Sequence, residues 1–207
     1  MSQQTMTPRS PVAPVTPVAG SAATINGIEI ESLKETIAAI ERDPSLARSR
    51  FRATNTWIAG NLNRTRITEF HAAGQDIAHG SEFTLEADEP PLLAGGDRAP
   101  NPVEHLLSAL VACLTTSMVA HAAVRGIEIE ELTSVVEGDI DLAGYLGLSN
   151  EVPRGYTDIR VDFQVKADGV GTETLKRLAQ FSPVFHTITE GANVEVRVSD
   201  GDAGVTG

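Results

Sequence analysis

The sequence contains a single cysteine, Cys113, among its 207 residues. A disulfide bond within the chain is therefore excluded, and a cytoplasmic location is the default expectation because reducing compartments keep thiols free. Free cysteines are among the most buried residue types, so inert packing is the ordinary explanation for a cysteine in an apolar segment. Whether Cys113 is a reactive centre or a small buried side chain is the question on which a functional interpretation depends.

Several catalytic and binding signatures are also lacking. The sequence contains no G-x-S-x-G, no G-x-x-x-x-G-K-[ST] and no G-x-G-x-x-G, so a hydrolase triad and nucleotide binding have no support. The five histidines show no metal-ligand spacing, such as two histidines four residues apart with a glutamate between them. We therefore expect neither a metal ion nor another cofactor.

Positive charge is scarce, since 16 Lys and Arg residues stand against 28 Asp and Glu residues, a formal net charge of −12. Phosphate binding requires a basic face, so general affinity for nucleic acid is not expected. No apolar run reaches the ~18 residues that a membrane span requires. The longest candidate, "VEHLLSALVACLTTSMVAHAAV", is interrupted by Glu104, His105 and His121, which predicts a core helix and no membrane partner.

The composition divides the chain into four parts. Residues 1–24 are rich in Pro, Ser, Thr, Ala and Val and have almost no charge, which predicts a disordered Pro-rich tail. Residues 25–48 predict an N-terminal helical extension, because apolar residues recur at helical spacing and Pro44 follows the expected helix end. Residues 50–199 are expected to form the main domain, and residues 200–207 a flexible C-terminus.

A long helix is predicted in the middle of the main domain. Asn101 is a good N-cap, Pro102 suits the first helical position, and Glu104 can complete a capping box. The helix is expected to run to Arg125 and to stop at Gly126. It is apolar nearly all round, so we expect it to be buried on most sides.

Strands are predicted on both sides of this helix. Residues 50–87 alternate partly between apolar and polar residues, which predicts about three strands. After the helix, "IEIEELTSVVEGDIDLAG" and "YTDIRVDFQVKAD" predict two strands, and "TETLKRLAQF" and "SPVFHTITEG" two short helices, the second capped by Ser182. "NVEVRVS" predicts a last strand. The predicted fold class is α+β with a mostly antiparallel sheet.

Nothing on the predicted long helix itself can activate Cys113. The thiol lies eleven residues after Pro102, beyond the first turn where the helix dipole acts. His105 and His121 are each eight positions away, ~12 Å along the helix axis. A reactive thiolate therefore requires a cationic neighbour from elsewhere in the fold.

The possible activators lie in other segments. Arg64 and Arg66 are on a predicted strand, and Arg98 is in the loop before the helix. The pattern alone favours a solvated surface charge for each of them over an activating role. A histidine partner, His186, His71 or His79, would have to reach the thiol through tertiary contact.

Two blocks of the sequence resemble the OsmC/Ohr family, which includes thiol peroxidases that act on organic hydroperoxides. They are "GGDRAPNPVEHLLSALVACL" and "RLAQFSPVFHTITEGANVEVRV", and the resemblance covers roughly residues 50–199. It implies an OsmC-like α+β fold with antiparallel sheets wrapped around a long buried central helix. It also implies an intertwined homodimer in which each site uses groups from both subunits.

The resemblance assigns roles to single positions. Cys113 matches the peroxidatic cysteine, and Arg64 and Arg66 lie in the region that supplies the activating arginine. The glutamate that orients this arginine directly follows the Asn-Pro pair in the family. Here Val103 occupies that position and Glu104 comes one residue, or ~100°, later. Ser182 occupies the position of the second, resolving cysteine.

A sulfenic acid on Cys113 would therefore have no second thiol in the chain to resolve it. Three interpretations stay open. The first is a one-cysteine peroxidase, which reduces organic hydroperoxides in an apolar pocket lined by the central helix and is recycled by an external thiol. The second is a related enzyme or binding protein that uses the same pocket for another small molecule. The third is a structural or sensor protein in which Cys113 is merely packed.

Overall fold

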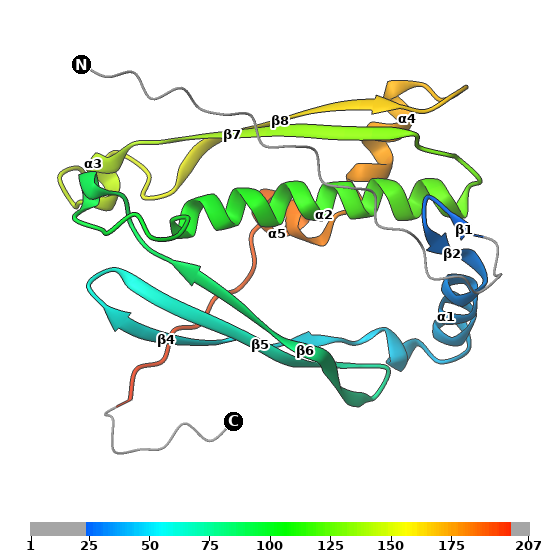
Figure 1. Cartoon of the computed structure of the whole chain (residues 1–207), viewed down its shortest axis with the longest axis horizontal. Coiled ribbons are helices and arrows are strands. Elements are labelled where there is room, and N and C mark those ends of the chain that lie inside the picture. Colours follow the sequence, from blue (N-terminus) through cyan, green and yellow to red (C-terminus); the bar gives the residue numbers. More distant parts are fainter. Residues whose placement is uncertain (1–23, 200–207) are drawn as a thin grey trace.

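The computed structural model describes residues 24–199, and within this range the chain forms two layers (Figure 1). One layer is an antiparallel sheet built from the first half of the chain. The other combines an antiparallel strand pair with three helices from the second half. The predicted α+β class with antiparallel sheets is confirmed. The tail predicted for residues 1–24 lies, but for Thr24, outside the described residues, as does the C-terminus predicted for residues 200–207.

The first layer is a four-stranded sheet centred on β5 (Leu62–Ala72). On one side β5 pairs with β3 (Arg50–Phe51) and β4 (Thr54–Ala59), and on the other with β6 (Gln75–Ala87). All these pairings are antiparallel, and short turns connect β4 to β5 and β5 to β6, which are neighbours in the chain. The sequence pattern predicted this meander.

The second layer packs helices on one face of the pair β7 (Glu131–Ile140) and β8 (Tyr156–Lys166). The helices are α2 (Pro102–Val124), α4 (Thr172–Ala179) and α5 (Pro183–Glu190). The core of the chain lies here, because α2 and α4 contribute its fully buried side chains and the inner residues of β8 pack against them. The core comprises Leu110, Leu114, Met118, Ala122, Leu175, Leu178 and Ala179.

Helix α2 starts as predicted. The Asn101 side chain accepts a hydrogen bond from the Glu104 amide, and the Glu104 side chain accepts one from the Asn101 amide, a complete capping box with Pro102 at the first position. The helix is also long and apolar enough to cross a membrane by length and composition alone. The expectation that no apolar run is long enough to span a membrane is therefore wrong for length and composition, a property that core helices share with membrane spans.

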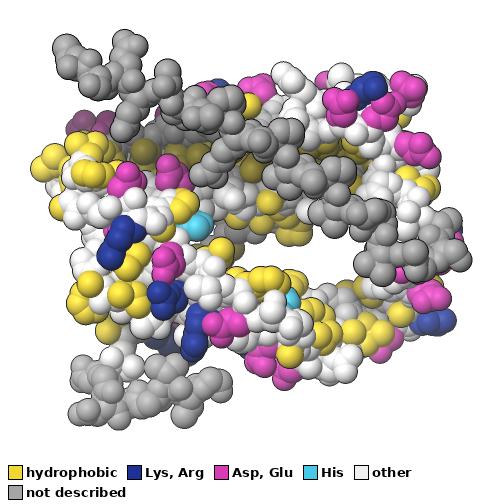
Figure 2. Space-filling model, viewed as in Figure 1, with side chains coloured by type: hydrophobic (Ala, Val, Ile, Leu, Met, Phe, Trp, Pro, Cys, Tyr) yellow, Lys and Arg dark blue, Asp and Glu magenta, His cyan; other side chains and the backbone are white. Residues whose placement is uncertain are grey.

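The expectation that α2 is buried on most sides is wrong for the single chain. Its buried residues form one stripe, from Leu110 to Ala122, that faces the second layer, whereas Leu106 is 40% exposed and Ala109, Ala112 and Thr116 are exposed as well. Figure 2 shows a hollow between the two layers, with hydrophobic side chains along its border. The apolar surface of α2 therefore exceeds what residues 24–199 of one copy cover.

The last predicted strand is also absent from the structure. Residues 191–199 have no regular secondary structure, although Val194, Val196 and Val198 alternate as a strand requires. These valines are 79%, 82% and 94% exposed. A strand exists only when its backbone groups find a partner, and within residues 24–199 none pairs with this segment.

The N-terminal segment lies at the end of α2 that carries Val124. It forms the two-residue strands β1 (Thr24–Ile25) and β2 (Ile28–Glu29), then helix α1 (Ile30–Arg42) and the short 3₁₀ helix η1 (Pro44–Ala47). The amphipathic helix predicted here is α1. Two short helical elements complete the described chain, η2 (Pro91–Leu93) and α3 (Leu142–Tyr145).

Candidate functional site

Cys113 lies in the middle of α2, beside the buried Leu114, and is itself partly buried. Its backbone carbonyl accepts a hydrogen bond of 3.1 Å from the hydroxyl of Thr116. Within residues 24–199, no hydrogen bond reaches the sulfur, and no arginine or histidine is joined to it. The thiol is thus partly accessible and has no activating partner in the described part of the chain.

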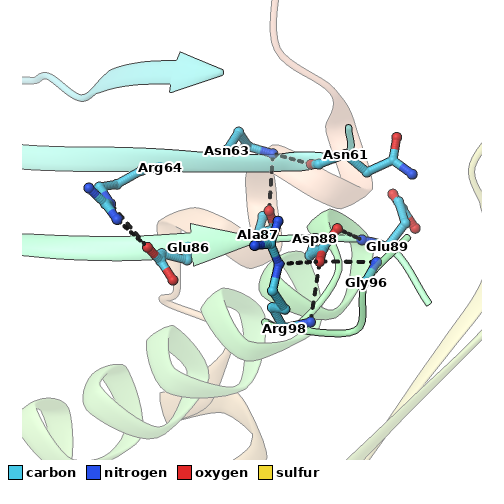
Figure 3. Close-up of polar contacts among 9 residues, drawn as sticks. All are labelled: Asn61, Asn63, Arg64, Glu86, Ala87, Asp88, Glu89, Gly96 and Arg98. Carbon is cyan, nitrogen blue, oxygen red and sulfur yellow. Dashed lines mark hydrogen bonds and ion pairs between the residues drawn. The ribbon is translucent and has the colours of Figure 1, made fainter. Parts of the chain in front are cut away.

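Arg64 and Arg66 are tied to carboxylates of the neighbouring strand. Nη2 and Nε of Arg64 donate to Oε1 of Glu86 at 2.7 and 3.0 Å, as Figure 3 shows. Nη1 of Arg66 lies 3.8 Å from Oε2 of Glu82, too far for a hydrogen bond. Of the two arginines, Arg66 is therefore the more available to another anion.

The two arginines share one face of the first sheet. Arg64 stands directly opposite Glu86, and Arg66 opposite Thr84, so these side chains project to the same side. The alternation places Phe83 and Leu85 on the other side, together with the single tryptophan, Trp57. These three side chains are 50%, 47% and 71% exposed, so the sheet has an apolar face that no residue of the range 24–199 covers fully.

Arg98 is held by a buried carboxylate at the base of its loop. Asp88 is only 1% exposed and accepts hydrogen bonds from the amides of Glu89, Gly96 and Arg98 at 2.9, 3.2 and 3.3 Å (Figure 3). Nε of Arg98 lies 3.5 Å from the same carboxylate. The hydrogen bond from the Glu89 amide, and more weakly those from the amides of Arg98 and Gly96, lower the pKa of Asp88 below its ordinary value. Arg98 is thus part of a loop anchor.

The loop can approach Asp88 because it contains glycine. A Cβ atom on Gly95 would lie 1.7 Å from the carbonyl oxygen of Glu89, and one on Gly96 2.9 Å from a carboxylate oxygen of Asp88. The flanking Ala94 and Asp97 adopt left-handed backbone angles, φ 59° and 52°. A tightly folded loop therefore delivers the chain to the start of α2.

Glu104 serves the helix cap described above, and no arginine among residues 24–199 pairs with it. The carbonyl of its neighbour Val103 accepts a hydrogen bond of 3.0 Å from the hydroxyl of Tyr156 on β8. Burial, and secondarily the charge of Glu104, raise the pKa of Tyr156 above its ordinary value. These contacts fix the first turn of α2 against the second layer.

Ser182 is completely buried and caps α5. Its hydroxyl oxygen accepts a hydrogen bond of 3.1 Å from the amide of Phe185, as the sequence predicted for an N-cap. The preceding Phe181 stacks on His121 of α2 with 4.0 Å between ring centroids. His186 lies one turn further along α5, where its Nδ1 is 3.2 Å from a carboxylate oxygen of the exposed Glu190.

An apolar cavity of about 520 Å³ lies on the other side of α2, between β8, α4 and α5. Leu114 and Met118 of α2, Phe163 of β8 and Phe185 of α5 are among its lining residues, with Lys176 at its polar part. Cys113 does not line it. An apolar pocket lined by the central helix was expected, but its position away from Cys113 was not, because helical spacing and strand alternation each predict a buried face but not where two such faces leave a gap.

Comparison with known proteins identifies the family to which this chain belongs. The described chain is an α+β protein with a partly accessible helix cysteine between antiparallel sheets, and within residues 24–199 no group of His, Cys, Asp and Glu could hold a metal ion. The family model described as OsmC-like protein matches residues 95–197. The chain belongs to this OsmC-like family, as the resemblance of its motifs indicated.

Two solved structures show the same fold at low sequence identity. One is an OsmC like protein from Mycoplasma pneumoniae, at 18% identity and a TM-score of 0.50, covering 72% of this chain and 96% of that one. The other, from Psychrobacter arcticus 273-4, is described as a candidate osmotic stress induced and detoxification response protein. It has 17% identity and a TM-score of 0.50, and covers 67% of this chain and 88% of that one. No curated protein matches the sequence.

Proposed function

We propose that the protein reduces organic hydroperoxides with Cys113 as the peroxidatic thiol and an external thiol as reductant. The observation that carries this proposal is the position of Cys113, on the long capped helix of an OsmC-like chain, where the family's motif has its peroxidatic cysteine. The single cysteine and the buried, capping Ser182 support an external reductant, because the chain contains no second thiol.

The proposed cycle has two stages. The Cys113 thiolate attacks one peroxide oxygen, the O–O bond breaks, and the products are a cysteine sulfenic acid and an alkoxide that takes up a proton to become an alcohol. An external thiol then attacks the sulfenic sulfur, releasing water and forming a mixed disulfide. A second external thiol attacks this disulfide, which restores Cys113 and leaves an external disulfide. Such recycling suits a reducing compartment, in keeping with a cytoplasmic location.

An arginine is expected to stabilise both the thiolate and the departing alkoxide. We assign this role to Arg66 in preference to Arg64, because the nearest carboxylate oxygen is 3.8 Å from Arg66 and 2.7 Å from Arg64. Arg98 is the weaker candidate because Asp88 engages it. Glu104 caps α2 and has no assigned part in the chemistry.

A homodimer completes the proposal. Three apolar surfaces stay exposed when only residues 24–199 of one copy are considered. They are one side of α2, the face with Trp57, Phe83 and Leu85, and the unpaired valines of residues 191–199. A second copy can place its own α2 in the hollow seen in Figure 2 and offer an unpaired strand edge to residues 193–199. Burial of α2 against the second copy would also explain why this helix is so apolar, with no need for a membrane.

The catalytic proposal is tested by titrating the reduced protein with cumene hydroperoxide and measuring intact mass. One equivalent should add one oxygen atom to the wild type within seconds and leave the Cys113→Ser variant unchanged. Dithiothreitol should then restore the original mass. A wild type that stays unmodified at stoichiometric hydroperoxide would remove the peroxidase proposal.

The second candidate is a binding protein for an apolar small molecule, with Cys113 structural. The observation that favours it is the cavity of about 520 Å³, a size that suits a small ligand, from which Cys113 is absent. A hydrophobic fluorescent probe such as ANS distinguishes the two functions. If binding is the function, the probe should bind wild type and Cys113→Ser equally well, and an apolar small molecule should displace it equally well from both. Leu114→Trp fills the cavity and should abolish binding of the probe.

A further inference from the structure

The apolar cavity beside α2 has a polar rim on one side only. The side chains of this rim lie on or directly after α4 and on α5, and all of them are exposed: Thr172, Glu173, Lys176, Gln180 and Thr189. The apolar lining residues, by contrast, are all buried or half-buried. The cavity therefore opens to solvent along α4 and α5 and closes against α2 and β8.

The apolar wall of the cavity is elongated. On β8 it runs along alternate residues from Ile159 to Val165, which is ~20 Å of strand. On α2 it runs from Leu110 to Met118, ~12 Å along the helix axis. A wall of this shape suits an extended hydrocarbon chain, whereas a compact ring would contact only part of it.

Lys176 brings a positive charge to the rim. It lines the cavity and is nevertheless exposed, so its aliphatic stem forms part of the wall while its ammonium group reaches the mouth. Both other lysines, Lys34 and Lys166, form ion pairs with glutamates. In the part of the chain that the structure describes, no carboxylate pairs with Lys176, so its ammonium group is available to the anionic group of a ligand.

The charges around the cavity make such a ligand specific for Lys176. The chain carries a formal net charge of −12, which repels anions in general. Glu173 lies on the same rim, three positions before Lys176, and adds a further negative charge. A preference for an anionic head group can therefore come only from a local cation, and Lys176 is the lining residue that supplies it.

We propose that this cavity binds a fatty acid. The hydrocarbon chain lies along β8 and α2, and the carboxylate meets the ammonium group of Lys176 at the mouth, where neither charge is buried. Fatty-acid binding rests on the second candidate function, which placed an apolar small molecule in this cavity. It does not require Cys113, which is absent from the lining.

Competition between two ligands of equal chain length tests the head group. Decanoate and 1-decanol are titrated against a neutral fluorescent probe, 1-aminoanthracene, on the full chain at neutral pH. Lys176→Gln should weaken decanoate about tenfold or more, the usual effect of losing a hydrogen bond to a charged group, and should leave 1-decanol unchanged. Glu173→Gln should tighten decanoate alone, because it removes a like charge.

Lys166→Gln is the matched control for Lys176→Gln. It removes the same charge from a lysine that Glu130 holds outside the cavity lining, so both affinities should stay unchanged. If Lys176→Gln leaves decanoate unchanged, or weakens both ligands equally, the fatty-acid proposal is overturned.

Two substitutions on β8 test where the chain lies. Val161→Trp on the lining face should weaken decanoate at least about tenfold, since excluding two CH₂ groups from the cavity already has an effect of that size. Gln164→Trp on the exposed face should leave it unchanged. Circular dichroism checks that both variants are folded.

Chain length gives an independent measurement of the same point. From octanoate to dodecanoate, affinity should rise about fourfold for each added CH₂ group, the effect of burying one methylene. An affinity that does not depend on chain length would place the chain outside the cavity and overturn the proposal.

The same titrations separate failure of the fatty-acid proposal from failure of the binding function. If 1-decanol displaces the probe and Lys176→Gln affects neither ligand, the carboxylate contact is refuted and the cavity stays a site for neutral apolar molecules. If neither the probe nor either ligand binds, the binding function and the fatty-acid proposal fall together. Oxidation of Cys113 by a hydroperoxide is measured separately and depends on neither result.

Discussion

Arg64 and Glu86 face each other across β5 and β6, and Nη2 and Nε of the arginine both donate to one carboxylate oxygen, at 2.7 and 3.0 Å. A guanidinium neutralised in this way is a weaker partner for a thiolate than one that is free. The neighbouring Arg66 lies two residues along the same strand and on the same face, but its carboxylate stands 3.8 Å away. The two arginines therefore differ in availability although they look equivalent in the sequence.

The first prediction separates these arginines. Arg66→Ala should slow peroxide oxidation of Cys113 by about 100-fold or more, the usual effect of removing one positioned donor. Arg64→Ala should slow it much less, because Glu86 already holds that side chain. Stopped-flow measurement of thiol loss gives both rates. Equal rates for Arg66→Ala and wild type would remove Arg66 from the chemistry.

The second prediction concerns the buried carboxylate of Asp88. Asp88→Asn should lower the urea midpoint at pH 7, because three backbone amides and Arg98 lose a charged acceptor. The pKa of Asp88 is lower in the folded state than in the unfolded state, where it is about 3.9. The ionised carboxylate therefore stabilises the fold fully above the unfolded-state pKa, and this stabilisation is lost as pH falls through the lower folded-state pKa.

The stability difference between wild type and Asp88→Asn should therefore be largest at neutral pH and shrink towards pH 3. Asp139→Asn is the matched control, because Asp139 is an exposed carboxylate whose pKa is also lowered, mainly by its hydrogen bond with Arg160. Its effect should be smaller, as solvent screens an exposed pair. A difference for Asp88→Asn that does not change with pH would contradict the assignment of charge to Asp88.

The third prediction addresses the close approach in the loop before α2. Gly95→Ala should destabilise the fold by roughly 2 kcal/mol or more, because its Cβ would lie 1.7 Å from a backbone oxygen that cannot move independently. Gly155→Ala, which meets no atom within 4 Å, should change the unfolding free energy by less than about 0.5 kcal/mol. Thermal or urea unfolding of the two variants measures the difference.

The fourth prediction concerns Asn26, whose side chain bonds to three backbone groups at the end of α2: the carbonyls of Val119 and Ile127 and the amide of Ile129. Asn26→Gly should cost about 1–3 kcal/mol of stability, since each hydrogen bond contributes ~1 kcal/mol net. Glycine tolerates the left-handed φ of 55° at this position, so backbone strain does not contribute to the loss. Hydrogen exchange should rise first at the amide of Ile129.

Local signals predicted much of this fold. The Asn101, Pro102 and Glu104 pattern set the start of α2, and Ser182 that of α5, because a helix cap involves only neighbouring residues. Residues 193–199 were predicted as a strand and are unpaired, since a strand depends on a partner that no local pattern contains. The same limit applied to the burial of α2, where apolar residues all round indicate cover but not which chain supplies it.

The candidate site was less predictable than the fold. Cys113 was identified by its motif, whereas the partners of Arg64, Arg66 and Arg98 depend on cross-strand register and loop closure. The buried role of Asp88 had no sequence signal at all, because an aspartate before a Pro-rich loop is ordinarily a surface residue.

The last prediction tests what Ser182 replaces. The hydroxyl of Ser182 caps α5, and α5 packs on α2, the helix that carries Cys113. If the two positions form the dithiol pair that the family's motif implies, Ser182→Cys should create a chain that resolves its own sulfenic acid. After one equivalent of hydroperoxide the variant should lose two hydrogen atoms by intact mass, where the wild type gains one oxygen atom. The exchange weakens the cap and should lower stability by about 1 kcal/mol.

A variant that gains one oxygen atom and forms no disulfide would contradict this prediction. It would show that the Cα atoms of the two positions lie farther apart than the roughly 4.4–6.8 Å that a disulfide allows. In that case the protein would need an external reductant for two reasons, because it lacks a second cysteine and because the fold holds positions 113 and 182 too far apart.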